Sequence, residues 1–111
     1  MQRLKPLLEA AQVSAYLAGH DHCAQHLDEG LGVQYHGVGA GILCASSTSH
    51  INAVPNGSLK WHYDAGLFGI LDGAYAHVHV NETGLTVEHF KSNGDLMYSA
   101  VPILPRRKRL K

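Results

Sequence analysis

The fold class is decided by one stretch of ten residues, Val13-Ser14-Ala15-Tyr16-Leu17-Ala18-Gly19-His20-Asp21-His22. Its first six residues have small and apolar side chains on both faces of an extended chain. That pattern is typical of a buried strand covered by a helical layer. Gly19 ends the strand, because glycine permits a tight exit into a loop. The stretch therefore predicts a buried strand followed by a Gly-His loop.

The segment before this strand predicts a short amphipathic helix that extends to Gln12. Apolar residues recur there at helical spacing from the outset, which predicts that the chain begins inside a domain. Pro6 fits such a helix only within its first turn, where a missing N–H has no intrahelical partner. A helix, a strand and a loop in this order indicate an α/β arrangement.

The remainder of the chain predicts mostly strands. Residues 33–38 form a second strand, and residues 44–58 are expected to be a loop because they are rich in Ser, Thr, Asn, Pro and Gly. Four later runs have β-rich composition and Gly-containing turns between them, and we expect them to form one antiparallel meander. These runs are 59–63, 74–80, 85–90 and 96–101. The expected whole is one N-terminal helix and a β-rich C-terminal sheet.

Charge is distributed unevenly along the chain. The formal net charge is zero, but five of the nine basic residues lie in positions 106–111, which leaves four basic and nine acidic residues in positions 1–105. An acidic body is a poor surface for nucleic acid. We therefore expect no nucleic-acid partner, and we expect residues 106–111 to be a solvated basic tail. We also expect no membrane partner, because no stretch approaches the apolar length of a membrane span and the first residues do not resemble a signal peptide.

The chemistry of the chain is concentrated in His20 and His22. Side chains at positions i and i+2 of an extended segment can point the same way, so two imidazoles could reach neighbouring metal ions. Loops at the carboxyl ends of strands commonly present ligands in α/β proteins. A divalent ion needs four to six donors, so this pair is only part of a metal site. Cys23 and Cys44 could be free thiols or one disulfide.

Ordered landmarks along nearly the whole chain resemble the purple acid phosphatases of the tartrate-resistant kind, within the calcineurin-like metallophosphoesterase superfamily. The landmarks are Leu4-Lys5-Pro6-Leu7-Leu8, Ala15-Tyr16-Leu17-Ala18-Gly19-His20-Asp21-His22, Gly32-Val33-Gln34-Tyr35, Gly39-Ala40-Gly41, Val54-Pro55-Asn56-Gly57 and Leu104-Pro105-Arg106-Arg107. This resemblance implies that residues 1–105 are the C-terminal part of a metallophosphoesterase domain. The whole domain is then a helix–sheet–sheet–helix sandwich.

The same resemblance implies a binuclear metal centre, iron with iron or zinc. His20 takes the place of a ligand to the divalent ion, and His22 that of a ligand to the ferric ion. The family's other ligands lie in blocks upstream of anything in this chain. The implied reaction is hydrolysis of a phosphate monoester, and the implied location is secreted or lysosomal. With only His20 and His22, we expect the chain to be inactive without the missing N-terminal part of the same domain.

A rival hypothesis is a non-catalytic β-rich module that binds a single metal or a protein partner through an exposed sheet edge. The other histidines receive no role. His77 and His79 are expected to face solvent, with Ala76, Val78 and Val80 on the core face. Five others lack a partner at ligand spacing and are expected to be surface or hydrogen-bonded histidines. These are His26, His36, His50, His62 and His89.

Overall fold

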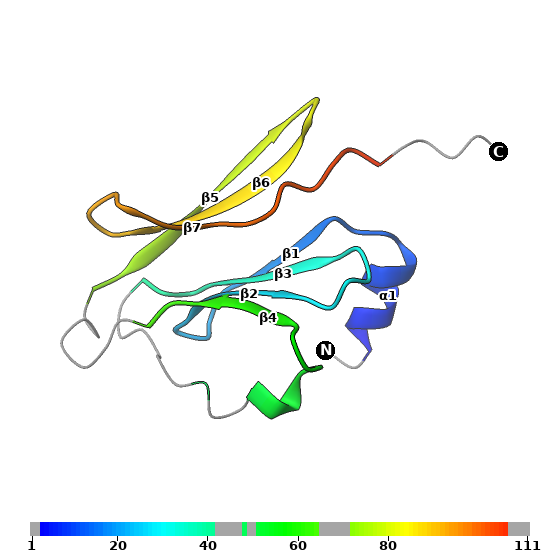
Figure 1. Cartoon of the computed structure of the whole chain (residues 1–111), viewed down its shortest axis with the longest axis horizontal. Coiled ribbons are helices and arrows are strands. Elements are labelled where there is room, and N and C mark those ends of the chain that lie inside the picture. The colour runs from blue at the N-terminus through cyan, green and yellow to red at the C-terminus, as the bar shows by residue number, and fades with distance from the viewer. Residues whose placement is uncertain (1–2, 42–47, 49–50, 65–71, 107–111) are drawn as a thin grey trace.

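The chain folds into two packed β-sheets and one short helix in a computed structural model that describes residues 3–41, 48, 51–64 and 72–106. Figure 1 shows the two sheets as layers, with the helix at one end of the lower layer. A four-stranded sheet has the order β1-β3-β2-β4, and a three-stranded sheet has the order β5-β6-β7. The elements are α1 (Leu4–Ala10), β1 (Ala15–Ala18), β2 (Ala24–Asp28), β3 (Gln34–Val38), the 3₁₀ turn η1 (Ile51–Ala53), β4 (Leu59–His62), β5 (Ala74–Asn81), β6 (Gly84–Lys91) and β7 (Leu96–Ser99). The α/β class is confirmed in this coarse form, with two sheets where one was expected.

The four-stranded sheet mixes parallel and antiparallel pairs. Strand β1 pairs with β3 in parallel, while β2 pairs with both β3 and β4 in antiparallel fashion. Strand β2 was not predicted, because its core-facing positions are Ala24 and His26, and a histidine weakens the apolar alternation. Gly30 and Gly32 have positive φ in the turn that follows β2, which lets β3 return beside it.

The predicted four-stranded meander is wrong for its first member. Strand β4 pairs with β2 in the mixed sheet, with Gln25 opposite His62 and His26 opposite Trp61. The other three predicted strands do form an antiparallel meander, β5-β6-β7. The run 59–62 has the composition of a strand in either sheet, so local pattern could not assign its partner. Part of the expected loop 44–58 lies outside the described residues, and the part that is described contains η1.

A strand does form within residues 13–18, but the expectation that it is buried is wrong. Strand β1 lies at the edge of its sheet, and its last two residues, Leu17 and Ala18, are exposed. Leu17 retains 44% of its exposure. Helix α1 has no buried residue, and its Leu7 is 66% exposed. Pro6 does fall in the first turn of α1.

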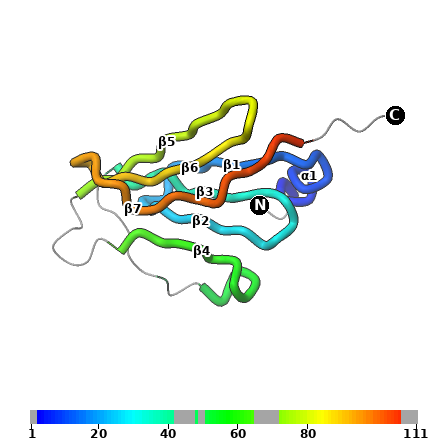
Figure 2. Tube along the Cα trace, turned by 45° about the horizontal axis from the view of Figure 1, so that its top comes forward, coloured from blue at the N-terminus to red at the C-terminus, as the bar shows by residue number. Residues whose placement is uncertain are grey.

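Small side chains and histidines fill the space between the two sheets. Buried alanines come from both sheets, and one cluster joins Ala24, Ala40 and Ala74 with Tyr63. The backbone N–H of Ala74 donates to the carbonyl of Ala40, so the chain enters the second sheet in direct contact with the first. Figure 2 shows β7 and β6 passing over the four-stranded sheet. The two sheets thus share one thin core.

Two basic side chains, Lys5 and Arg106, tie the ends of the described chain to this frame. Lys5 of α1 forms an ion pair with Glu29, 2.5 Å apart, next to the turn between β2 and β3. Arg106 donates to the carbonyls of Gly32 and Val13, at 2.7 and 3.2 Å. Residues 107–111 of the expected basic tail lie outside the described residues. Within the described part, no helix has the length and apolar character needed to cross a membrane.

Candidate functional site

The loop Gly19–His22 lies at the carboxyl end of β1, where the sequence placed it. Because β1 and β3 are parallel, their carboxyl ends meet at one edge of the sheet. The loop therefore lies beside Gly39, which follows β3. A Cβ atom on Gly39 would lie 2.1 Å from the carbonyl oxygen of Asp21. Only a glycine at position 39 lets the loop approach this closely.

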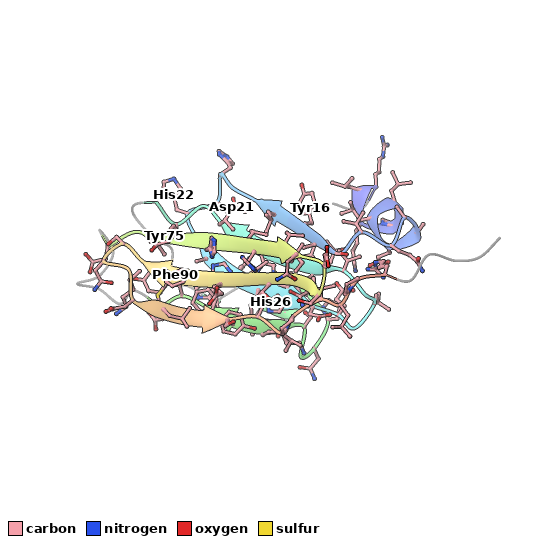
Figure 3. All side chains as sticks on the ribbon, turned by 90° about the horizontal axis from the view of Figure 1, so that it is seen from above. Tyr16, Asp21, His22, His26, Tyr75 and Phe90 are labelled. Carbon is pink, nitrogen blue, oxygen red and sulfur yellow. The ribbon has the colours of Figure 1, made fainter. Side chains whose placement is uncertain are left out.

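The backbone of the loop is bent tightly. His20 has φ of 77°, a left-handed conformation that is uncommon outside glycine. The N–H of Cys23 donates to the carbonyl of Asp21 at 2.7 Å, which closes the turn before β2 begins. His20, Asp21 and His22 are all exposed. Figure 3 shows Asp21 and His22 on this loop, beyond the end of β1.

The loop offers two imidazoles but not a full ligand set. Within the described ranges, no three His, Cys, Asp or Glu side chains come together in a way that could hold a metal ion. Two imidazoles fit the nitrogen donors that zinc and iron accept, so the loop suits part of a metal site. The assignment of His20 and His22 as ligands stays a prediction. Cys44 lies outside the described residues.

His77 and His79 face solvent, as expected. Their ring centroids lie 6.1 Å apart, and His77 approaches Glu88 at 3.8 Å. The core face opposite them is only partly covered, because Val78 is 37% and Val80 is 66% exposed. Figure 1 shows this end of β5 rising away from the four-stranded sheet. The expectation that Val78 and Val80 lie in the core is therefore wrong, and Ala76 is half-buried.

The main finding that the sequence did not indicate is a buried cluster of three histidines between the sheets. His26, His36 and His89 retain only 2%, 2% and 1% of their exposure. The rings of His26 and His36 stack at 4.3 Å, and His36 faces His89 at 5.3 Å. Of the two predicted alternatives, surface or hydrogen-bonded, the second holds for these three. His62 is half-buried in β4, and His50 lies outside the described residues.

Hydrogen bonds fix the proton positions in this cluster. Gln34 donates through Nε2 to the carbonyl of Val101 at 2.9 Å, so its Oε1 faces His36 as an acceptor. His36 must then carry its proton on Nε2, which lies 3.1 Å from that oxygen. Its Nδ1 is left as an acceptor for the Nε2–H of His89, also at 3.1 Å. A directed chain of hydrogen bonds thus runs from β6 through His36 to Val101.

Burial keeps the cluster uncharged. Desolvation, reinforced by His26 and His89, lowers the pKa of His36 to about 3. Desolvation and His26 lower the pKa of His89 to about 4. Desolvation also lowers the pKa of His26, against the opposing effect of Asp28. All three rings are therefore neutral at pH 7.

Aromatic rings surround the histidines. Trp61 stacks on Tyr98 at 4.9 Å and lies 4.8 Å from His89. The hydroxyl of Tyr98 is 2.7 Å from Nδ1 of His26. Tyr75 is 47% exposed, and it stacks on Phe90 on the outer face of the three-stranded sheet. Figure 3 shows Tyr75 and Phe90 on neighbouring strands.

One sequence signal could have indicated the cluster. His26 and His36 lie at alternate positions with Ala24 and Gln34, the core-facing sites of β2 and β3. Recognising β2 would have placed both histidines on one face of a hairpin. His89 is separated from His36 by 53 residues, so no local pattern could join it to them.

Comparison with known proteins relates the chain to phosphatases, although no family model matches it. It is 38% identical over 111 residues to tartrate-resistant acid phosphatase type 5 of Homo sapiens, and 37% identical to that of Mus musculus. These matches cover 98% of this chain but only 32% of each relative. Purple acid phosphatase 3 of Arabidopsis thaliana is 28% identical over 98 residues, covering 87% of the chain and 25% of the relative.

The matched relatives are tartrate-resistant acid phosphatases of animals and a purple acid phosphatase of a plant. Both are named as phosphatases, which are hydrolases. The mixture of one helix and two sheets is compatible with part of a metallophosphoesterase fold. The chain is therefore related to the purple acid phosphatases along almost its whole length, as the counterpart of about a third of such a protein.

Proposed function

We propose that this chain is the C-terminal portion of an acid phosphatase that hydrolyses phosphate monoesters, and that His20 and His22 are two ligands of its binuclear metal centre. The observation that carries this proposal is the loop Gly19–His22. It leaves the carboxyl end of a strand, presents two exposed imidazoles and belongs to a chain related to purple acid phosphatases. The metals are iron with iron or zinc.

A bound metal pair would supply Lewis-acid stabilisation of the phosphate oxygens and activation of a water molecule. The chain's own contribution is to hold two imidazoles at fixed positions. The contact between Asp21 and Gly39 seats the loop against the end of β3. The hydrogen bond from Cys23 to Asp21 limits how far the loop can move. Such supporting contacts orient metal ligands.

The 111 residues alone are proposed to be inactive. Two imidazoles fall short of the four to six donors that each ion needs, and carboxylates are required to balance the charge of two metals. We propose that the missing N-terminal part of the same domain supplies the other ligands. The acidic composition of positions 1–105 argues against nucleic acid as a partner. We also propose that the whole protein is secreted or lysosomal.

A chimera tests the proposal. In it, this chain replaces the matching third of the human relative, and hydrolysis of p-nitrophenyl phosphate is measured at mildly acid pH. We expect the chimera to be active. His20→Ala and His22→Ala should each reduce turnover by more than about 100-fold, because losing even a residue that supports a ligand costs about 10–100-fold. The His77→Gln/His79→Gln chimera is the matched control, since it removes another exposed i, i+2 pair.

Equal losses in the control and in the loop variants would contradict the proposal. So would p-nitrophenyl phosphate turnover by the isolated chain that disappears in His20→Ala, because the site would then be complete. The rival non-catalytic module would bind a partner through an exposed sheet edge, and β1 is an edge strand of the mixed sheet with Leu17 44% exposed. An inactive, well-folded chimera would favour that rival.

A further inference from the structure

The core between the sheets is built around histidine rather than aliphatic side chains. His36 and His89 are the bulkiest side chains that are fully buried, ahead of Val87 and Ser58. The buried apolar residues are mostly alanines. Histidine is rarely the centre of a core, because a charge on it would be costly to bury. Because His36 and His89 lie between the two sheets, a proton added to either ring would place a charge inside the contact between the sheets.

Two hydrogen bonds of the cluster cross from one sheet to the other. His36 of β3 accepts from His89 of β6, and His26 of β2 pairs with the hydroxyl of Tyr98 on β7. The first bond requires an unprotonated Nδ1 on His36, because Nε2 is committed to Gln34. A proton added to that Nδ1 would turn the acceptor into a donor. Two N–H groups would then face each other at 3.1 Å. The bond could survive only if His89 moved its own proton to Nδ1, which is buried and has no hydrogen-bond partner among the described residues.

Few neighbouring groups could offset a charge on these rings. From β2, Asp28 favours the charged form of His26, whereas Lys60 of β4 opposes it. The neighbours that act on His36 are His26 and His89 themselves. Gln34 of β3, Trp61 of β4 and Tyr98 of β7 are uncharged. Nδ1 of His89 and Nε2 of His26 have no hydrogen-bond partner among the described residues, so a proton there would also lack an acceptor.

We propose that the cluster His26–His36–His89 is an acid-sensitive latch, whose protonation releases the three-stranded sheet from the four-stranded sheet. The latch is closed when all three rings are neutral. Opening exposes Trp61 and Tyr98, which cover the cluster. This proposal does not depend on the phosphatase activity, because none of the three histidines belongs to the loop Gly19–His22.

The sign of the pH dependence follows from the direction of the shifts. In the folded chain the pKa values of these histidines lie below the unfolded value of about 6.5. Between about pH 6.5 and 4 the unfolded chain therefore binds protons that the folded chain does not. The contribution of these neutral histidines to the free energy of unfolding is fully present above that window and is lost as the pH falls through it. The range from 6.5 to 5 lies above the ordinary titration of carboxylates, so it isolates the histidines.

The test is urea unfolding of the full 111-residue chain from pH 7.5 to 5, followed by the fluorescence of Trp61, its single tryptophan. We expect unfolding to take up about two to three protons near pH 5, so the unfolding constant rises roughly 100-fold or more per pH unit. The double variant His36→Gln/His89→Gln should lose about two of these protons. The matched double variant His77→Gln/His79→Gln removes two exposed histidines and should keep the steep dependence.

A second measurement tests the latch if the core variant fails to fold. Nitrogen NMR of the wild-type histidine rings at pH 6 should show His36 and His89 both neutral, each with Nε2 protonated and Nδ1 bare. The two rings are assigned through their neighbours. A charged His36 at pH 6 would overturn the latch. Wild-type uptake of less than one proton, or an unchanged slope in the core variant, would overturn it too. A chain without cooperative unfolding at pH 7.5 would do the same, since the cluster would not be a formed contact.

Discussion

At the scale of single residues, Gly39 leaves room for the candidate metal-binding loop, because it has no Cβ atom. It lies just beyond β3, and a Cβ atom added there would meet the carbonyl of Asp21 and the amide nitrogen of His20. Its requirement for glycine comes from this close approach, since its φ is not among the positive values. The sequence shows a glycine here but not the backbone that it contacts.

Gly39→Ala should displace the loop that carries His20 and His22. The added Cβ would lie 2.1 Å from a backbone oxygen, and backbone cannot move aside as a flexible side chain can. We expect a loss of about 1–3 kcal/mol in the free energy of unfolding, as for other overpacked sites. Urea denaturation at pH 7.5 measures it. Gly41→Ala is the control, because a Cβ there meets nothing within 4 Å. Equal losses in both variants would contradict the contact.

The three histidines of the latch also show what local sequence leaves hidden. Each is an ordinary histidine by its neighbours in sequence, and none has a partner at metal-ligand spacing. Their low pKa values arise from burial first and from one another second. Both causes are set by tertiary packing, so the sequence could not supply them.

Among the elements, β6 organises the second sheet. It lies between β5 and β7, and its Val87 is completely buried. Val80 of β5 points to the same side of the sheet but stays 66% exposed, because this end of β5 rises away from the mixed sheet (Figure 1). Val80 and Val87 therefore have the same side chain on the same face of the sheet, but only Val87 is buried.

Val87→Ala should cost roughly 2–3 kcal/mol of unfolding free energy, since it removes two buried methyl groups and leaves a cavity. Val80→Ala should change stability by less than about 0.5 kcal/mol, as exposed substitutions usually do. Thermal or urea denaturation at pH 7.5 compares the pair. A similar effect in both variants would mean that the mixed sheet does not cover β6 as described.

At the scale of the whole molecule, Arg106 fastens the end of the described chain to its beginning. One guanidinium nitrogen donates to the carbonyls of Gly32 and Val13, which lie 74 and 93 residues away in sequence. Leu85 and Ile103 also form a short antiparallel bridge in this segment. The segment that follows β7 thus runs from the second sheet back to the first.

Arg106→Ala should lower the unfolding free energy by about 1 kcal/mol, the usual worth of a hydrogen bond in a protein. Amide hydrogen exchange should become faster at Ile103 and Leu85, because their bridge loses its anchor. Lys91→Ala, an exposed basic residue at the end of β6, serves as the control for loss of charge. Unchanged exchange at Ile103 in the Arg106 variant would show that the guanidinium does not hold this segment in place.

By itself the sequence determined where most elements lie. Helix α1, strands β3 to β7 and the loop after β1 follow from period, glycine and turn residues, which are local properties of the chain. It also singled out His20 and His22 as metal-ligand candidates, an assignment that stays a prediction. A short strand can be recognised from the alternation of polar and apolar side chains along it. This alternation can be seen without knowing which strand it pairs with.

Only the tertiary structure decided which strands pair and which faces are covered. It moved β4 into the mixed sheet, left β1 exposed at an edge and gathered His26, His36 and His89 into one buried cluster. Pairing and burial depend on residues far apart in sequence, and a short strand fits several partners equally well. The charge state of a histidine, and with it the proposed acid latch, is therefore a property of the packed molecule rather than of any segment of it.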